Sequence, residues 1–150
     1  LIRQMPRATE ALRVAHQYGP CWLASDATNW VILLKLQEVG INPQIFEEIF
    51  SLDRCGVSKG IDLYWQLIDT KLDEQKAKPI FVDNRLDRLS AARRTLPNCQ
   101  LIYVASDDHP SGLRLFPKCD FSGLIRFHQA THETLPDVLR KVASEIETRN

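Results

Sequence analysis

Short apolar segments that alternate with helix-like segments constrain the fold of this chain most strongly. The apolar segments are residues 21–24, a strand around Ile49 and Phe50, residues 80–82, residues 101–104 and a short one at 124–125. Helical patterns cover residues 7–18, 26–39, 59–72, 86–94 and 133–147. Strands alternating with helices are typical of βαβ units with right-handed crossovers. We therefore predict an α/β protein: a three-layer, Rossmann-like parallel sheet with helices on both faces, in one domain over residues 1–150.

The apolar residues of the two central helices predict which of their faces are buried. For the helix over 26–39, the predicted packing side is Trp30, Val31, Leu34 and Leu36. For the helix over 59–72, it is the stripe of Ile61, Leu63, Tyr64, Leu67 and Ile68. Residues 45–52 read as a short helix that runs into a strand, and residues 105–118 as a long loop.

Composition narrows the environment of the chain. Its 19 basic residues balance its 19 acidic ones, so no overall charge attracts nucleic acid or an anionic membrane. No apolar run approaches the roughly 18 residues that span a bilayer, and no signal peptide is visible. The four cysteines are widely spaced, which favours reduced thiols over a disulfide set or a zinc site. We expect a cytoplasmic protein without nucleic-acid or membrane partners.

Two carboxylates, Asp83 and Asp87, follow the apolar segment at 80–82. Asp83 stands at the carboxyl end of the predicted strand, where open α/β sheets bind their ligands, and Asp87 falls in the first turn of the next helix. Two such oxygen ligands suit Mg²⁺, which takes one or two carboxylates and keeps waters or phosphate oxygens. The alternative is that an Asp at this junction is an ordinary N-cap.

Two further junctions carry polar residues suited to an anion. Ser25 and Asp26 follow the strand at 21–24, where a hydroxyl and free helix N–H groups make an anion seat, or a simple N-cap. Lys59 stands at the predicted start of a helix, where a cation opposes the helix dipole. This placement indicates a ligand for Lys59, and the alternative is a solvated lysine. The order along the chain is hydroxyl, lysine, acidic pair.

This order resembles the haloacid dehalogenase-like (HAD-like) superfamily of phosphohydrolases over nearly the whole chain. The segment Trp22-Leu23-Ala24-Ser25-Asp26 is similar to the second motif of that family, and Gly56-Val57-Ser58-Lys59-Gly60 to the third. Phe81-Val82-Asp83-Asn84-Arg85-Leu86-Asp87 resembles the fourth. Residues 5–19 look like the helix that leads into the second motif, and residues 118–121 and 135–139 are similar to the closing strand and helix.

The resemblance implies a specific chemistry. Ser25 and Lys59 would be catalytic, and Ser25, Asp26 and Lys59 would bind the phosphoryl group of a small phosphorylated substrate. Asp83 and Asp87 would bind the Mg²⁺ cofactor, with Asp87 tuning its geometry or orienting Lys59. In the family an Asp nucleophile forms an aspartyl-phosphate. The implied activity is Mg²⁺-dependent hydrolysis of a phosphate ester.

The sequence departs from the family pattern at several points. Gly60 follows the lysine where Pro is frequent, and Asn84 replaces a common Asp or small residue. The first motif, a strand ending in Asp-x-Asp that carries the nucleophile and the general acid, is absent. In the family that strand lies between those matching residues 21–24 and 80–82. We therefore expect a C-terminal portion that is inactive alone, with the missing strand supplied by an upstream segment or a second chain.

The competing interpretation is a non-catalytic, Rossmann-like module that binds a partner or ligand. The missing nucleophile favours it. Other features read as structural: His128 and His132, at helical i, i+4 spacing, predict a solvated pair rather than a metal site. A basic helix face, predicted to be solvated or to contact an acidic substrate or partner, comprises Arg85, Arg88, Arg93 and Arg94.

Overall fold

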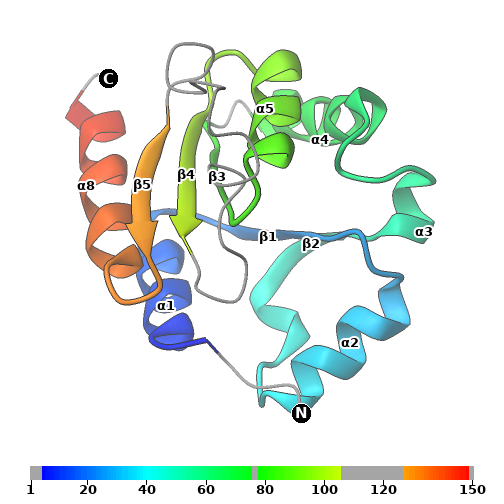
Figure 1. The fold of residues 1–150 in the computed structure, drawn as a ribbon, viewed down its shortest axis with the longest axis horizontal. Helices are drawn as coiled ribbons and strands as arrows, with labels where there is room; N and C mark the ends of the chain where they lie inside the picture. The colour runs from blue at the N-terminus through cyan, green and yellow to red at the C-terminus, as the bar shows by residue number, and fades with distance from the viewer. Residues whose placement is uncertain (1–4, 76–77, 106–126, 149–150) are drawn as a thin grey trace.

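The computed structural model describes residues 5–75, 78–105 and 127–148 and shows a mixed α/β protein with two small parallel sheets (Figure 1). Its helices are α1 (Ala8–Tyr18), α2 (Asn29–Glu38), the 3-10 helix η1 (Pro43–Ile45), α3 (Leu52–Cys55), α4 (Asp62–Gln75), α5 (Leu86–Thr95) and α8 (Leu135–Thr148). Its strands are β1 (Cys21–Ala24), β2 (Phe46–Phe50), β3 (Ile80–Asp83), β4 (Gln100–Ala105) and β5 (His128–Thr131). Among the described residues, no helix is both long and apolar enough to cross a membrane.

The five strands form two separate sheets. β1 pairs with β2, with Ala24 opposite Phe50, and β3, β4 and β5 pair in that order, with Asp83 opposite Tyr103. All pairings are parallel, and none of those between described strands joins β1 to β3. In Figure 1 the β1–β2 ribbons lie at a steep angle to β3 and β4.

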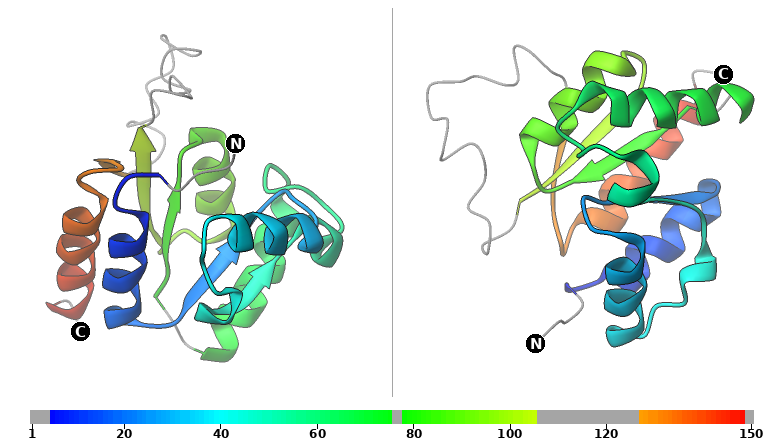
Figure 2. Two further views of the ribbon diagram at one scale, coloured as in Figure 1. Left: turned by 90° about the horizontal axis from the view of Figure 1, so that it is seen from below. Right: turned by 90° about the vertical axis from the view of Figure 1, so that its right-hand side faces the viewer.

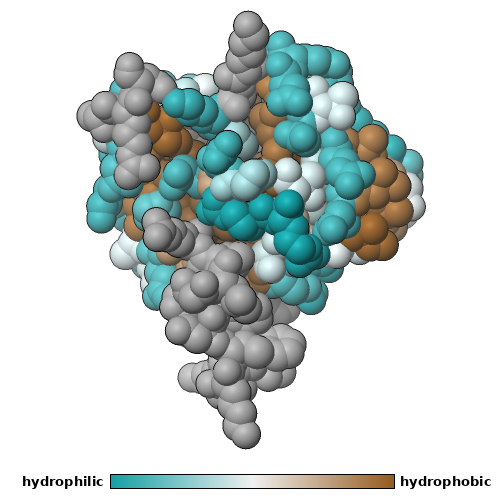
Figure 3. Space-filling model, turned by 90° about the horizontal axis from the view of Figure 1, so that it is seen from above, coloured by the Kyte–Doolittle hydropathy of each residue, from teal (hydrophilic) through white to brown (hydrophobic). Residues whose placement is uncertain are grey.

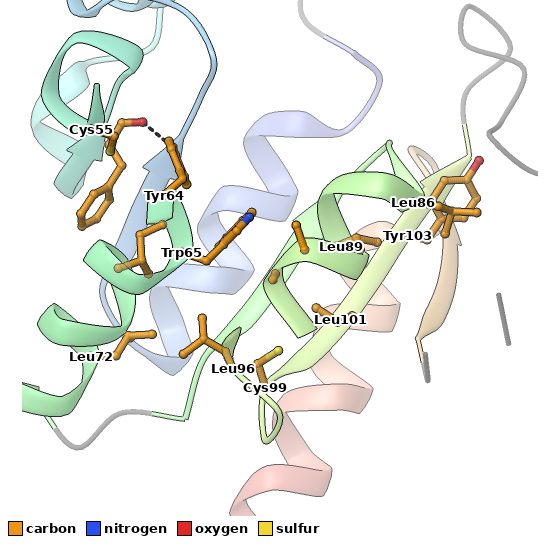
Figure 4. Packing of buried hydrophobic residues seen from close by; sticks show 14 residues of the cluster. Cys55, Tyr64, Trp65, Leu72, Leu86, Leu89, Leu96, Cys99, Leu101 and Tyr103 are labelled. Carbon is orange, nitrogen blue, oxygen red and sulfur yellow. Dashed lines mark hydrogen bonds between the residues drawn. The ribbon is translucent and has the colours of Figure 1, made fainter. Parts of the chain in front are cut away.

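The larger apolar core lies between α4, α5 and the β3–β4 part of the sheet. From α4 it takes Tyr64, Trp65 and Ile68, each at most 2% exposed. Figure 4 shows Trp65 on the side of α4 that faces α5, and Tyr64 on the side near Cys55. An edge-to-face contact between Trp65 of α4 and Phe81 of β3, with ring centroids 5.1 Å apart, continues the packing onto the sheet. This core fixes the position of α4 and of the segment before it.

The smaller core joins the first and last helices to the other side of β4. Val14 of α1 and Val142 of α8 are almost fully buried, together with Ile102 and Val104 of β4. Figure 2 shows α1 and α8 lying side by side. Outside this core, Arg7 hydrogen-bonds to Glu10 and to the carbonyl of Glu133, which precedes α8. The two faces of β4 are therefore covered by different helix pairs.

The predicted strand–helix alternation is confirmed at most positions. For β1, the observed bounds are the predicted ones, residues 21–24. The buried faces of α2 and α4 were predicted correctly only in part. On α2, Leu36 is buried as predicted, together with Ile32, whereas Trp30 is 67% exposed and Leu34 is 43% exposed. On α4, Tyr64 and Ile68 are buried as predicted, with Trp65 and Leu72, but Ile61, Leu63 and Leu67 are exposed. Both segments hold more apolar residues than one helix face can bury. Figure 3 shows a patch of apolar side chains at the right-hand edge of this face, with further apolar side chains at its upper left.

The prediction was also wrong at the third sheet strand. β5 was not predicted, and His128 lies in it, 3.2 Å from Gln100, so His128 and His132 do not share a helix face. Val82 of β3 is 42% exposed, so β3 is not the fully buried strand that its apolar run predicts. The expected loop beyond Ala105, the strand at 124–125 and Cys119 lie outside the described residues.

Candidate functional site

Four of the five predicted site residues occupy junctions between elements, and the fifth lies in a first helical turn. Ser25 and Asp26 follow β1, Asp83 is the last residue of β3, and Asp87 lies in the first turn of α5. Lys59 precedes α4 by three residues and is not at its start, so the predicted conflict with the helix dipole does not arise. Each of these junctions lies next to residues of the larger apolar core, such as Ala24, Phe81 and Leu86.

Lys59 connects two of the predicted acids. Its backbone N–H donates to Asp26 Oδ1 over 2.6 Å, and its ammonium forms an ion pair with Asp83 Oδ2. Its carbonyl accepts the indole N–H of Trp65 over 2.7 Å, so the buried ring of α4 also orients this segment. The side chains of Lys59 and Asp83 are only 14% and 10% exposed. The structure thus brings Asp26, Lys59 and Asp83 together from three junctions.

Ser25 is held by a residue that the sequence predicted only as part of an apolar stripe, Tyr64. The Ser25 N–H lies 3.0 Å from both the Phe50 carbonyl and the Tyr64 hydroxyl, and that hydroxyl donates to the same carbonyl over 2.6 Å. Burial raises the pKa of Tyr64 above its ordinary value, because desolvation disfavours the phenolate. The Ser25 hydroxyl oxygen accepts the N–H of Ala27 over 3.1 Å.

Asp83 and Asp87 have different surroundings. Asp83 Oδ1 accepts the N–H of Arg85 over 3.0 Å, while Asp87 accepts two bonds from the Arg85 guanidinium, at 3.1 and 3.0 Å. These bonds raise the pKa of Arg85. The Asp87 side chain is 52% exposed. Asp87 is therefore a surface residue on the rim of the cluster, and Asp83 is its buried member.

The N-cap alternatives do not account for these acids. The residue that caps α2 is Thr28, which makes no side-chain capping bond, and the first N–H of α2 is accepted by Asp53 over 2.9 Å. The cap position of α5 is Arg85, without a side-chain capping bond. Asp26 and Asp83 instead use their carboxylates to bind Lys59 and their neighbours.

Arg88 of α5 also belongs to this cluster, although the sequence indicated only a basic helix face. Its side chain is 14% exposed, and Nη1 lies 2.5 Å from Asp26 Oδ2. Two other arginines of that face are more exposed: Arg94 is 55% exposed and pairs with Asp62, and Arg85 is 58% exposed. The only sequence sign for Arg88 is its spacing along α5. It comes one residue before the buried Leu89 and one helical turn before the buried Ala92.

The described residues contain no group of three His, Cys, Asp or Glu side chains that could hold a metal ion, so the Mg²⁺ site stays a prediction. A cavity of about 750 Å³ lies elsewhere, at the amino ends of β3 and β4, lined among others by Lys78, Gln100 and His128. None of the predicted site residues lines it. The cluster is an ion-pair network between junctions rather than a preformed pocket.

Comparisons with known proteins add no relative to this geometry. No protein-family model matches the chain, and a search of curated proteins gave no match.

Proposed function

We propose that this chain carries most of a HAD-like phosphohydrolase site, on a three-layer, Rossmann-like sheet that a further strand completes. One observation carries the proposal. Residues of three predicted motifs meet directly: Asp26 binds the backbone of Lys59, and Lys59 pairs with Asp83. Positions so far apart in the sequence are brought together as a shared phosphoryl site would require.

The divided sheet supports the need for a further strand. β1 and β3 are parallel-sheet strands whose second edges pair with no described strand. Unpaired N–H and C=O groups at such an edge are a template for another strand. A strand inserted between β1 and β3 would join the two sheets into one, with β2, β1, the new strand, β3, β4 and β5 in order. An upstream segment or a second chain would supply it.

The roles of the residues follow from their chemistry. A carboxylate on the supplied strand would attack phosphorus as the bond to the alcohol oxygen breaks, and a second acid would protonate that oxygen. Lys59 would neutralise charge on the phosphoryl oxygens. Ser25 would hydrogen-bond one of these oxygens, oriented by the bonds that Tyr64 and Phe50 make to its backbone. Water would then hydrolyse the aspartyl-phosphate.

Asp83 has the donor type that Mg²⁺ prefers, a carboxylate at the carboxyl end of a strand. Its oxygens contact Lys59 and the Arg85 N–H, and Asp87 lies at the exposed rim. The described residues therefore fit part of a Mg²⁺ site, with a further carboxylate expected from the supplied strand. Bound Mg²⁺ would stabilise negative charge on the phosphoryl oxygens.

Hydrolysis of p-nitrophenyl phosphate, with and without Mg²⁺, tests this proposal. The 150-residue chain should be inactive, and a longer polypeptide carrying the missing strand should be active only with Mg²⁺. In the active polypeptide, Asp83→Ala and Lys59→Met should each abolish most turnover, whereas Arg94→Met, on an exposed pair, should not. Activity of the 150-residue chain that Asp83→Ala removes would exclude the need for a supplied strand. Inactivity of the longer polypeptide would overturn the phosphohydrolase assignment.

A second candidate function is a non-catalytic interaction module. It is favoured by the apolar side chains that α2 leaves exposed, Trp30, Leu33 and Leu34, at the i, i+3, i+4 spacing of one helix face. Millimolar Mg²⁺ with a phosphate mimic separates the two candidates, because ligands of the native state raise the melting temperature. No shift in either the 150-residue or the longer polypeptide would favour the interaction module.

A further inference from the structure

Arg88 brings a second, largely buried cation to the proposed phosphoryl site. Its Nη1 lies 2.5 Å from Asp26 Oδ2, and a Cβ built on Gly60 would lie 3.8 Å from the same nitrogen. The guanidinium therefore lies beside Asp26, which follows Ser25 in the sequence, and beside Gly60, which follows Lys59. Like Lys59, its side chain is 14% exposed.

The donors of this guanidinium are not satisfied by the described part of the chain. Nε and Nη1 are buried, and no described residue accepts a hydrogen bond from them. Asp26 at 2.5 Å and Asp87 at 3.7 Å supply opposite charge without hydrogen-bond alignment. By contrast, Arg94 on the same helix donates from Nε and Nη2 to Asp62, at 3.2 and 3.0 Å. Buried donors left without acceptors are costly, which points to an acceptor that the described residues do not provide.

We propose that Arg88 is a phosphate-binding residue of the site, and that Asp26 occupies its guanidinium when no phosphoryl group is bound. This inference rests on the proposed function for the identity of the ligand, the dianionic phosphoryl group of a monoester or of free phosphate. Lys59 and Arg88 together match the two charges of that dianion. The planar guanidinium suits two parallel bonds to phosphate oxygens, which a carboxylate contact through one nitrogen does not use.

The arrangement makes Asp26 a competitor of the ligand. Its Oδ2 faces Arg88, whereas its Oδ1 accepts the Lys59 N–H. Asp26→Asn can keep the acceptor for Lys59 and removes the charge that neutralises Arg88. If Arg88 receives phosphate, that substitution strengthens binding. If the pair is only a structural tie, the same substitution loosens the site and weakens binding, as Arg88→Met does.

Titration of the 150-residue chain with inorganic phosphate, followed by calorimetry at constant ionic strength and without Mg²⁺, tests the inference. Asp26→Asn should tighten phosphate binding by about tenfold, and Arg88→Met should weaken it by about tenfold or more, the range expected for one charged hydrogen bond. Arg88→Lys should retain part of the affinity. Arg94→Met, on the same helix, should bind as the parent chain does.

The sign of the Asp26→Asn effect decides the matter even if Arg88→Met fails to fold. Weaker binding by both Asp26→Asn and Arg88→Lys, or equal losses in Arg94→Met and Arg88→Lys, would overturn the inference. So would a parent chain and an Asp26→Asn variant that both fail to bind phosphate. Because no turnover is measured, the two proposals fail separately. An active longer polypeptide whose KM is unchanged by Arg88→Lys would remove only the role of Arg88. Arg88-dependent phosphate binding without hydrolysis would remove only the phosphohydrolase assignment.

Discussion

Lys59 and Asp83 form an ion pair between two parts of the molecule that no described strand pairing connects. Lys59 belongs to the segment between α3 and α4, which the Asp26 carboxylate ties to β1, and Asp83 ends β3. The pair thus links the β1–β2 sheet to the three-stranded sheet. Because both side chains are at least 86% buried, the pair is shielded from solvent ions more than a surface pair is.

A double-mutant cycle with Lys59→Met and Asp83→Asn should give a coupling free energy of about 1 to 3 kcal/mol in urea unfolding. Each single substitution leaves the other charge buried without its partner, whereas the double substitution removes both. The matched control is the cycle of Arg85→Met and Asp87→Asn, whose side chains are more than half exposed. Its coupling should stay below about 0.5 kcal/mol. Equal coupling in the two cycles would show that burial does not distinguish the pairs.

Tyr64→Phe should lower the free energy of unfolding by about 1 to 3 kcal/mol. The substitution removes a buried hydroxyl that donates to the Phe50 carbonyl and accepts from the Ser25 N–H, and leaves the ring in place. Chemical denaturation measures the change. Tyr18→Phe, at an exposed tyrosine, is the control and should change stability by less than about 0.5 kcal/mol. Similar losses for both variants would contradict the role assigned to the hydroxyl.

The pair between Arg7 and Glu10 should make stability depend on pH in the acid range. The two hydrogen bonds from Arg7, each 2.7 Å, hold the pKa of Glu10 below its ordinary value of 4.5. A lowered folded-state pKa stabilises the fold above the unfolded-state pKa, and this contribution is lost as pH falls through the folded-state value. Glu10→Gln should therefore reduce the dependence of the unfolding free energy on pH below about pH 5. Arg7→Gln should reduce the pH dependence over the same range. Chemical denaturation at a series of pH values measures it, and a variant profile parallel to that of the parent chain would refute the prediction.

Cys99 should react slowly with thiol reagents in the native state. Burial raises its pKa to about 11, and its side chain is 2% exposed, whereas Cys21 is half-buried. At pH 8, iodoacetamide labelling followed by peptide mass mapping should modify Cys21 before Cys99, which should react only on unfolding. Between the unfolded value near 9.0 and 11, the unfolded chain releases a proton that the native chain keeps. Stability should fall with rising pH in that window, and Cys99→Ala should reduce this fall.

The predictable strands and helices were those whose local pattern left one solution. β1 and β4 are apolar runs between clear breakers, and α1 and α5 have bounds within a residue of their predicted ones. β5 could not be predicted, because its sequence His-Gln-Ala-Thr has one apolar residue. Its strand geometry comes from parallel pairing with β4 and from burial of Ala130. The buried faces of α2 and α4 were predicted only in part. Apolar residues surround each helix, so periodicity alone does not choose between its sides.

The candidate site divided in a similar way. Ser25, Asp26, Lys59 and Asp83 could be proposed as site residues from the sequence because each was expected near a strand or helix end, a position that local sequence marks. Their partners Tyr64 and Arg88 could not, because they lie inside helices and reach these residues across the packing of α4 and α5. A tyrosine in an apolar stripe and an arginine in a basic face carry no local sign of a distant contact. Tertiary packing alone assigns them.

The packing of α1 against α8 has a consequence for how the chain acquires its structure during synthesis. Val14 and Val142 share one core with Ile102 and Val104 of β4, yet they come from the first and last described helices. Contacts between such distant segments form late, because a growing chain emerges from its N-terminal side at about 5 to 20 residues per second. The α1 side of this core can form early, but the face of β4 stays incompletely covered until the α8 residues have left the ribosome. During this interval the apolar residues that α8 later covers are accessible to chaperones.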